Sequence, residues 1–328
     1  MINIKEVVLR SEKEIISSWV NKENIVVSVV CSTYNHESYI EDAIISFLMQ
    51  ETNFAFEVII HDDASNDETT NIIRKYQSLY QNIIKPIFQK ENQYSKGGFK
   101  PLIYAMGFAS GEYLALCEGD DYWIDQYKLN NQLALLKKNS EIQLCFSDGL
   151  YLWKDGTSKK KGGYTKTSYT IEEVISGGGA FMITASLMIN SQVLKSLPDW
   201  LPSSPVGDYV IQVLGSKGGA VRYEVESCVY RVEAVGSWSS STDYYGYTFY
   251  NKMKTMFDNL DKELCEEYKC YFKERKIERI VNFIISRVQH SHNNTMTDVF
   301  RFLLNEPKLF FYATVEVLRK ALKKAMLK

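Results

Sequence analysis

Short apolar runs that alternate with helical patterns are the feature that most constrains the fold of this 328-residue chain. The first run, Ile25–Cys31, is rich in β-branched residues, and residues 37–48 then repeat apolar side chains at three- and four-residue spacing. The run Phe56–Ile60 precedes a similar helical pattern, and two further runs lie near residues 83–89 and 113–117. Such continuous apolar runs are typical of strands buried on both faces of a parallel sheet. The pattern predicts an α/β fold with a mostly parallel central sheet and flanking helices.

Polar clusters follow three of these predicted strands at the point where each strand ends. They are residues 32–37, 61–67 and 118–121. In an open sheet of this kind, ligands bind in the crevice beyond the carboxyl ends of the strands. A single polar cluster could be an ordinary loop, but three ordinary loops are much less expected to place polar clusters at the same edge of the sheet. We therefore expect a binding site there.

The third cluster, Glu118-Gly119-Asp120-Asp121, places three carboxylates within four positions directly after an apolar strand. Glu118 and Asp120 are two residues apart, so their side chains lie on the same side of an extended segment, and Gly119 lets the chain bend close to a ligand. Carboxylate oxygens suit hard divalent cations. The cluster predicts a site for Mn²⁺ or Mg²⁺, and a solvated acidic turn is the alternative that the same residues allow.

The overall composition narrows the class of partner. The chain has 38 basic and 40 acidic residues, a net charge of -2, which argues against a nucleic-acid binder because such proteins carry a basic excess. The first residues do not form a signal-peptide pattern, and no apolar run has the length that a membrane span needs. We therefore expect a folded cytoplasmic protein with a small or local partner.

The residues after the first strand exclude one kind of phosphate site and argue against another. No Gly-x-Gly-x-x-Gly motif follows Ile25–Cys31, so a dinucleotide site of that type is excluded. The same position holds Ser-Thr-Tyr-Asn-His-Glu, where a nucleotidyltransferase should carry a glycine-rich, basic loop. A cation held by Glu118 and Asp120 would neutralise bound phosphates instead.

Three ordered motifs in residues 25–150 resemble those of the family 2 glycosyltransferases, which have the GT-A fold and transfer sugars from activated nucleotides with inversion. The first is the strand Ser28–Asn35, which ends in Thr-Tyr-Asn. The second is the Asp-Asp-x-Ser-x-Asp-x-Thr series at residues 62–69, and the third is Gly111-Glu112-Tyr113, which leads to the acidic cluster. Glu118 stands where many members have Asp, and a longer carboxylate can still reach a metal. The resemblance is to the members that build bacterial surface polysaccharides.

This resemblance implies a nucleotide-diphosphate sugar, with a UDP-sugar favoured, as the donor. It implies that the nucleotide is bound by Ser32, Thr33, Tyr34, Glu37, Asp62, Asp63 and Asp120. Asp63 would accept a hydrogen bond from the edge of the base. It also implies that Glu118 and Asp120 bind the metal and that Asp121 and Trp123 help to position the sugars. Two alternatives stay open: residues 62–67 also suit an Asx-type helix cap, and Tyr34 also suits a packed loop aromatic.

Asp208 is the predicted catalytic base. Residues 206–209, Val-Gly-Asp-Tyr, open a helical pattern, and in the resembled family a carboxylate at this point deprotonates the acceptor hydroxyl. A helix start favours the ionised form of a carboxylate. An N-cap role would fit the local sequence equally well. Further on, Tyr230–Glu233 with Gly236–Ser239 resembles the closing motif of the family, in which many members have His where Glu233 stands.

The chain is expected to divide into a GT-A domain at residues 1–244 and a C-terminal helical region at 245–328. Within the first, residues 25–150 form the nucleotide-sugar half and 151–244 the acceptor half. The polar loop at Lys154–Lys166 suits either a mobile lid or an ordinary hairpin. The last segment, 308–328, combines an apolar face with a basic end, so it suits an oligomer contact, a packed helix or a peripheral membrane anchor.

The predicted activity is the transfer of a sugar to an acceptor hydroxyl, on a growing or lipid-linked surface glycan. The alternative is a protein that binds nucleotide sugars, or a nucleotidyltransferase-like protein, without glycosyl transfer. Carboxylates at positions 118, 120 and 208 favour the transferase.

Overall fold

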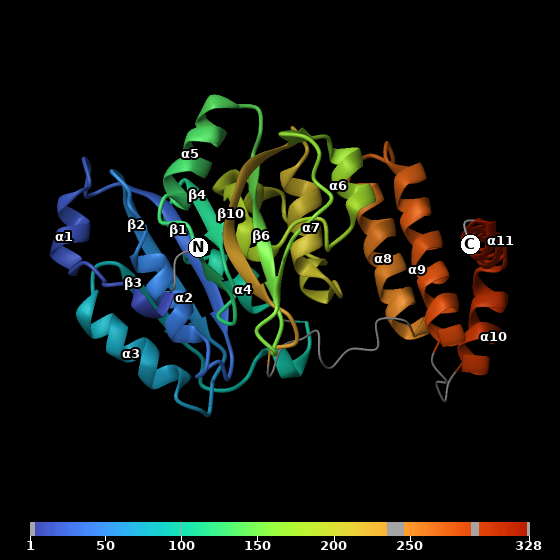
Figure 1. Ribbon diagram of the computed structural model, residues 1–328, viewed down its shortest axis with the longest axis horizontal. Helices are drawn as coiled ribbons and strands as arrows, with labels where there is room; N and C mark the ends of the chain where they lie inside the picture. Colours follow the sequence, from blue (N-terminus) through green and yellow to red (C-terminus); the bar gives the residue numbers. More distant parts are fainter. Residues whose placement is uncertain (1–3, 99, 235–245, 290–294, 327–328) are drawn as a thin grey trace. The chain divides into compact units, whose positions relative to one another are not determined.

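The computed structural model describes residues 4–98, 100–234, 246–289 and 295–326 (Figure 1). The chain divides into two compact units. The first comprises Met1–Val174, Gly179–Ser203 and Gly207–Ser241, and the second comprises Ile175–Gly178, Ser204–Val206 and Thr242–Lys328.

The first unit is built on one sheet in the order β3-β2-β1-β4-β9-β6-β10-β5, with β7 added to β6 and β8 added to β10. Strands β1 to β4 pair in parallel, as do β6 and β10, whereas β9 runs antiparallel between β4 and β6. The predicted α/β fold with a mostly parallel central sheet is therefore confirmed. The strands are β1 (Ile25–Thr33), β2 (Ala55–Asp62), β3 (Ile84–Phe88), β4 (Tyr113–Leu116), β5 (Tyr122–Trp123), β6 (Leu144–Leu152), β7 (Ser158–Lys160), β8 (Ser168–Tyr169), β9 (Met188–Asn190) and β10 (Ala220–Arg231).

Helices cover this sheet because its strands present buried apolar side chains to them. Val27 and Val29 of β1 pack in one cluster with Ile44 and Phe47 of α2, while α4 packs against β1 and β2. The helices of this part are α1 (Glu12–Ser17), α2 (Ile40–Leu48), α3 (Thr69–Leu79), α4 (Pro101–Met106), α5 (Lys128–Lys138), α6 (Ile171–Gly177) and α7 (Gly207–Gly215), with short 3₁₀ helices at Ile4–Glu6, Tyr94–Lys96, Thr184–Ser186, Ser191–Ser196 and Leu201–Ser203.

The register of the central strands brings their carboxyl ends together. Thr33 at the end of β1 lies opposite Asp62 at the end of β2, and Val30 lies opposite Leu116 at the end of β4. The polar clusters that follow these strands therefore share one edge of the sheet, as predicted.

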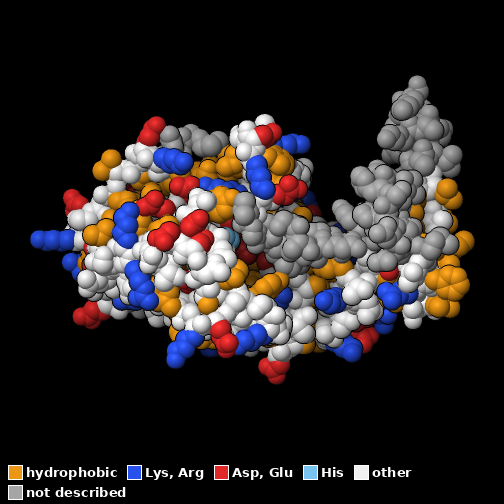
Figure 2. All heavy atoms as spheres, turned by 90° about the horizontal axis from the view of Figure 1, so that it is seen from below, with side chains coloured by type: hydrophobic (Ala, Val, Ile, Leu, Met, Phe, Trp, Pro, Cys, Tyr) orange, Lys and Arg blue, Asp and Glu red, His pale blue; other side chains and the backbone are white. Residues whose placement is uncertain are grey.

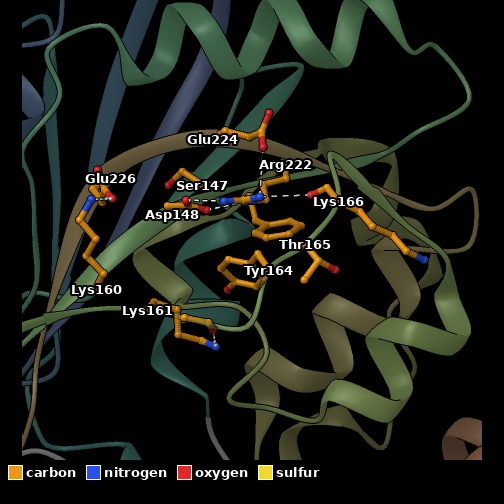
Figure 3. A network of polar contacts seen from close by, with 12 residues as sticks. Ser147, Asp148, Lys160, Lys161, Tyr164, Thr165, Lys166, Arg222, Glu224 and Glu226 are labelled. Atoms are coloured by element: carbon orange, nitrogen blue, oxygen red, sulfur yellow. Dashed lines mark hydrogen bonds and ion pairs between the residues drawn. The ribbon is translucent and has the colours of Figure 1, made fainter.

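The segment Lys154–Lys166 begins as a hairpin, which was one of the two predicted forms. β7 pairs antiparallel with β6, and the turn is closed by the Trp153 N–H donating to the Thr157 carbonyl at 2.9 Å. Figure 3 shows how β6 is joined to β10: the guanidinium of Arg222 donates twice to the carboxylate of Asp148, both at 2.6 Å. Residues 180–190 contribute the short strand β9 after a 3₁₀ turn.

The second unit is helical in its described parts, as predicted for the C-terminal region. Its helices are α8 (Tyr247–Glu263), α9 (Lys269–Gln289), α10 (Thr295–Asn305) and α11 (Pro307–Met326). Tyr250, Ile280, Phe283, Phe302 and Ala313 form its core. Across the described ranges, every helix is too short or too polar to cross a membrane.

Candidate active site

The acidic turn Glu118–Asp121 is fixed against the end of β1. The Cys117 N–H donates to the Val30 carbonyl at 3.1 Å, and the Gly119 N–H donates to the Ser32 carbonyl at 2.9 Å. A Cβ at Gly119 would lie 2.7 Å from Oγ1 of Thr33, so only glycine lets the turn approach this closely. The turn is therefore held directly beside the predicted nucleotide residues.

The residues predicted to bind the nucleotide from β1 lie at this edge. Ser32 is partly buried and Tyr34 is 37% exposed. Thr33 is buried, and its Oγ1 has no hydrogen-bond partner among the residues that the structure describes. Glu37 is exposed and accepts a hydrogen bond from the Glu68 N–H at 3.0 Å. Thr33 and Tyr34 thus keep groups that a ligand can use, whereas Glu37 joins two loops.

Asp62 is engaged within the protein. Its carboxylate accepts hydrogen bonds from the N–H and Oγ of Ser65, at 3.0 and 2.6 Å, and from Oγ1 of Thr70 at 2.5 Å. With 1% of its surface exposed, it shapes the turn before α3. The structure thus favours the local turn-forming role over nucleotide binding for Asp62.

Asp63 is also covered. Its two carboxylate oxygens accept from the backbone N–H groups of Gln93 and Tyr94, each at 2.9 Å, and its side chain is 1% exposed. A carboxylate has about four acceptor positions, so Asp63 retains bonding capacity. A base edge could use that capacity only if the segment at Gln93–Tyr94 moved.

Asp121 and Trp123, predicted to place the sugars, are both buried in the structure. Asp121 is fully buried, and its Oδ1 accepts from the Arg231 N–H at 2.9 Å. Trp123 is also fully buried: its indole N–H donates to the Ala185 carbonyl at 2.8 Å, and its ring packs edge-on against Phe47. The chain turns inward after Asp120 because β5 pairs with β10, so both side chains enter the core.

Arg231 holds the acidic turn from β10, a role that sequence reasoning did not assign. Its guanidinium donates to the Asp120 carbonyl at 2.7 Å, pairs with Asp42, and lies 4.4 Å from the ring centroid of Tyr122. The only sequence signal was its place in the Tyr230–Glu233 motif. Glu233 is exposed, and residues 236–239 of that motif lie outside the described residues.

Asp208 lies at the start of α7, as its second residue. Its carboxylate accepts from the Tyr209 N–H at 2.8 Å and from Oγ1 of Thr184 at 3.3 Å. Burial raises the pKa of Asp208, while these hydrogen bonds and the positive charge of Lys100 oppose that change. Because Asp208 lies inside the helix, the predicted alternative of an N-cap is not supported.

Asp208 and the acidic turn share one electrostatic environment. The pKa of Glu118 is raised to about 8, first by burial, then by the charge of Asp120 and then by that of Asp208. Lys100 adds a positive charge, since its side chain lies 3.8 Å from where a Cβ on Gly207 would stand. The structure therefore brings together carboxylates from β4 and α7.

The donor set at the acidic turn fits a divalent cation that arrives with a phosphate ligand. Glu118 and Asp120 are partly exposed and offer hard oxygen donors. Among the described residues, no group of three or more His, Cys, Asp or Glu side chains could hold a metal ion. Magnesium sites commonly use one or two carboxylates together with substrate phosphates, so two carboxylates match that arrangement.

A family model described as "Glycosyl transferase family 2" matches residues 28–196. The Mycobacterium tuberculosis protein Rv1520, described as uncharacterized, is 35% identical over 219 residues, which cover 65% of this chain and 61% of the relative. The Escherichia coli protein WfaP, named as a UDP-Glc:alpha-D-GlcNAc-diphosphoundecaprenol beta-1,3-glucosyltransferase, is 34% identical over 130 residues, or 40% of this chain and 48% of WfaP.

Among solved structures, Staphylococcus aureus TarS (residues 1–349) in complex with UDP-GlcNAc superposes with a TM-score of 0.56. The superposition covers 88% of this chain and 79% of that one, at 19% sequence identity. At this identity the similarity shows a shared fold.

Proposed function

The chain belongs to glycosyl transferase family 2, and we propose that it transfers a sugar from a nucleotide-diphosphate sugar to an acceptor hydroxyl with inversion at the anomeric carbon. One observation carries this proposal. Asp208 of α7 lies within electrostatic reach of Glu118, although 90 residues separate them in the sequence. This supports a site that combines a carboxylate able to take a proton with carboxylates able to hold a cation.

The proposed donor site is the edge formed by β1, β2 and the acidic turn. Glu118 and Asp120 would hold Mn²⁺ or Mg²⁺, which when bound neutralises the diphosphate leaving group. The exposed ring of Tyr34 and the unpartnered hydroxyl of Thr33 support a nucleotide beside them. A UDP-sugar is the donor we favour, and Ser32 completes the wall of the proposed nucleotide site.

In the proposed reaction, the acceptor oxygen attacks the anomeric carbon while the bond from that carbon to the diphosphate breaks. Asp208 takes the proton from the acceptor hydroxyl. A general base works best when its pKa is near the working pH, and burial moves the pKa of Asp208 in that direction. Its hydrogen bond from Thr184 orients the carboxylate for this task.

The proposed acceptor is a surface glycan, either growing or linked to a lipid. The name of the relative WfaP describes a sugar on diphosphoundecaprenol as its acceptor. A lipid-linked acceptor would bring this protein to a membrane surface, which agrees with the peripheral membrane contact predicted for residues 308–328.

Calorimetry with UDP, GDP and dTDP, with Mn²⁺ and with chelator, tests the donor site. We expect binding of one nucleotide that needs the cation and is lost in the Asp120→Ala variant, because the diphosphate would otherwise meet the carboxylates of the acidic turn. Equal affinity in chelator would contradict the proposed cation site. A nucleotidyltransferase would instead release pyrophosphate from a nucleoside triphosphate, and a binding protein would leave the nucleotide sugar intact.

A further inference from the structure

The second unit exposes a group of large apolar side chains on α10 and α11. They are Phe300 (64% exposed), Leu303 (48%) and Leu304 (72%) on α10, and Phe311 (65%), Tyr312 (52%), Val315 (48%) and Leu318 (59%) on α11. We call these seven residues the outer face. Figure 2 shows hydrophobic side chains gathered on this part of the surface. Contiguous exposed apolar patches mark protein or membrane interaction sites.

The outer face is not needed for packing within the unit, because α11 has a second apolar face that does this. Phe310, Ala313 and Val317 pack in a cluster with Ile280 and Val281 of α9. Phe311, Val315 and Leu318 recur at four- and three-residue spacing, so they share a different side of the helix. The core of the unit therefore leaves most of the outer face uncovered; the ammonium of Lys273 on α9 lies 5.4 Å from the ring centroid of Tyr312.

The chain around the outer face is strongly basic, although the whole protein has a net charge of -2. Residues 300–328 contain seven basic residues and two acidic ones. Five of the seven, Arg319, Lys320, Lys323, Lys324 and Lys328, fall in the last ten positions, which contain no acid. This excess is local, and Arg319, Lys320, Lys323 and Lys324 lie in α11, the same helix as Phe311 and Leu318.

We propose that α10 and α11 dock on the surface of an anionic membrane without crossing it. Aromatic and aliphatic side chains beside basic residues are the composition of helices that lie in the headgroup region, and anionic lipids attract basic segments next to a membrane. A second copy of the chain is the competing occupant of the outer face, and light scattering distinguishes it from a membrane. This proposal goes beyond sugar transfer and does not depend on it.

Sedimentation of the full chain with vesicles tests the proposal. We expect binding to vesicles of 70% phosphatidylcholine and 30% phosphatidylglycerol at 50 mM salt, at least tenfold weaker binding to pure phosphatidylcholine, and marked loss at 500 mM salt because exposed charges are screened. No acceptor is present, so the outcome is independent of the proposed transfer reaction.

Two variants and their matched controls locate the contact. Phe311→Ser with Leu318→Ser should weaken vesicle binding at least tenfold, while Val8→Ser with Leu79→Ser should not; Leu79 and Leu318 are both 59% exposed. The double variant Lys320→Glu with Lys323→Glu should also weaken vesicle binding at least tenfold. Its control, Lys137→Glu with Lys138→Glu on α5, should leave vesicle binding unchanged.

Circular dichroism and light scattering complete the test. The proposal expects all four variants to remain folded and of unchanged mass. It is overturned if the full chain ignores the anionic vesicles, if the control variants lose binding equally, if Phe311→Ser with Leu318→Ser unfolds the second unit, or if that variant turns an oligomer into a monomer.

Discussion

The backbone N–H of Arg231 donates to Oδ1 of Asp121 at 2.9 Å, across 110 residues of sequence. The same arginine donates from its guanidinium to the Asp120 carbonyl and pairs with Asp42. The acidic turn after β4 is therefore held by β10, which ends at Arg231. Its geometry depends on a residue that lies far from it in the chain.

Replacing Arg231 with Gln should weaken cation-dependent nucleotide binding about tenfold, because the side-chain hold on Asp120 and the pair with Asp42 are lost. Calorimetry with Mn²⁺ and the preferred nucleotide measures this change. Arg222→Gln is a matched control: the Arg222–Asp148 pair is buried to a similar extent, with side chains 12% and 14% exposed against 13% and 15% for Arg231–Asp42. We expect both variants to lose stability and only the first to lose affinity; equal affinities would contradict the positioning role.

Asp208→Asn should leave donor binding intact and lower turnover by about 10²-fold or more, as expected when a general base is removed. Steady-state rates and nucleotide affinity measured on the same preparation separate the two effects. Asp155→Asn, in the exposed hairpin turn, serves as a control for the loss of one carboxylate. Near-normal turnover of Asp208→Asn with the true acceptor would show that this carboxylate only supports the start of α7.

Trp123→Phe should destabilise the fold by about 2 kcal/mol, because the hydrogen bond to the Ala185 carbonyl and part of the packed ring are lost. Urea unfolding measures this cost. The KM for the donor should change little, since the fully buried ring cannot touch a sugar. A tenfold rise in that KM with unchanged stability would restore the sugar-placing role.

Lys128 gives a pH-dependent prediction. It is fully buried, and its ammonium donates to Oε1 of Gln132. Burial lowers the pKa of Lys128 to about 8, against 10.5 for an ordinary lysine. A lysine with a lowered folded pKa opposes folding at low pH, and this cost disappears as the pH rises from about 8 towards 10.5.

The free energy of unfolding of the natural protein should therefore rise relative to that of Lys128→Met between pH 7.5 and pH 10, by up to about 3 kcal/mol. Urea unfolding of both proteins at several pH values provides the measurement. A difference that stays constant over this range would mean that the pKa of Lys128 is not lowered in the folded protein.

The strands and the edge that carries the site could be predicted because their signals are local. Ile25–Cys31 is apolar throughout and polar residues follow it, so both the strand and its ligand-facing end are visible in a few residues. The burial of Trp123 could not be predicted, for the opposite reason. Its neighbour Asp120 is in the site, but pairing of β5 with Cys228 and Val229 turns Trp123 into the core, and that pairing is not written in the local sequence.

The same limit explains why the roles of Arg231 and Asp62 could not be predicted from the sequence. The contact of Arg231 with the acidic turn joins two distant strands, so no spacing rule points to it. For Asp62 the sequence allowed both a ligand contact and a local turn, and only the positions of Ser65 and Thr70 decide between them.

The transfer reaction itself gives the most direct test of the proposed function. The full chain is incubated with each of a panel of nucleotide sugars, with Mn²⁺ and with a lipid-linked glycan acceptor, and the released nucleoside diphosphate and the new glycosidic bond are measured together by chromatography and NMR. The account predicts that one donor yields both products in equal amounts and that the anomeric configuration is inverted. It also predicts that the Asp120→Ala and Asp208→Asn variants form both products much more slowly than the natural protein. Transfer with retained configuration, or transfer that both variants carry out at the rate of the natural protein, would contradict it.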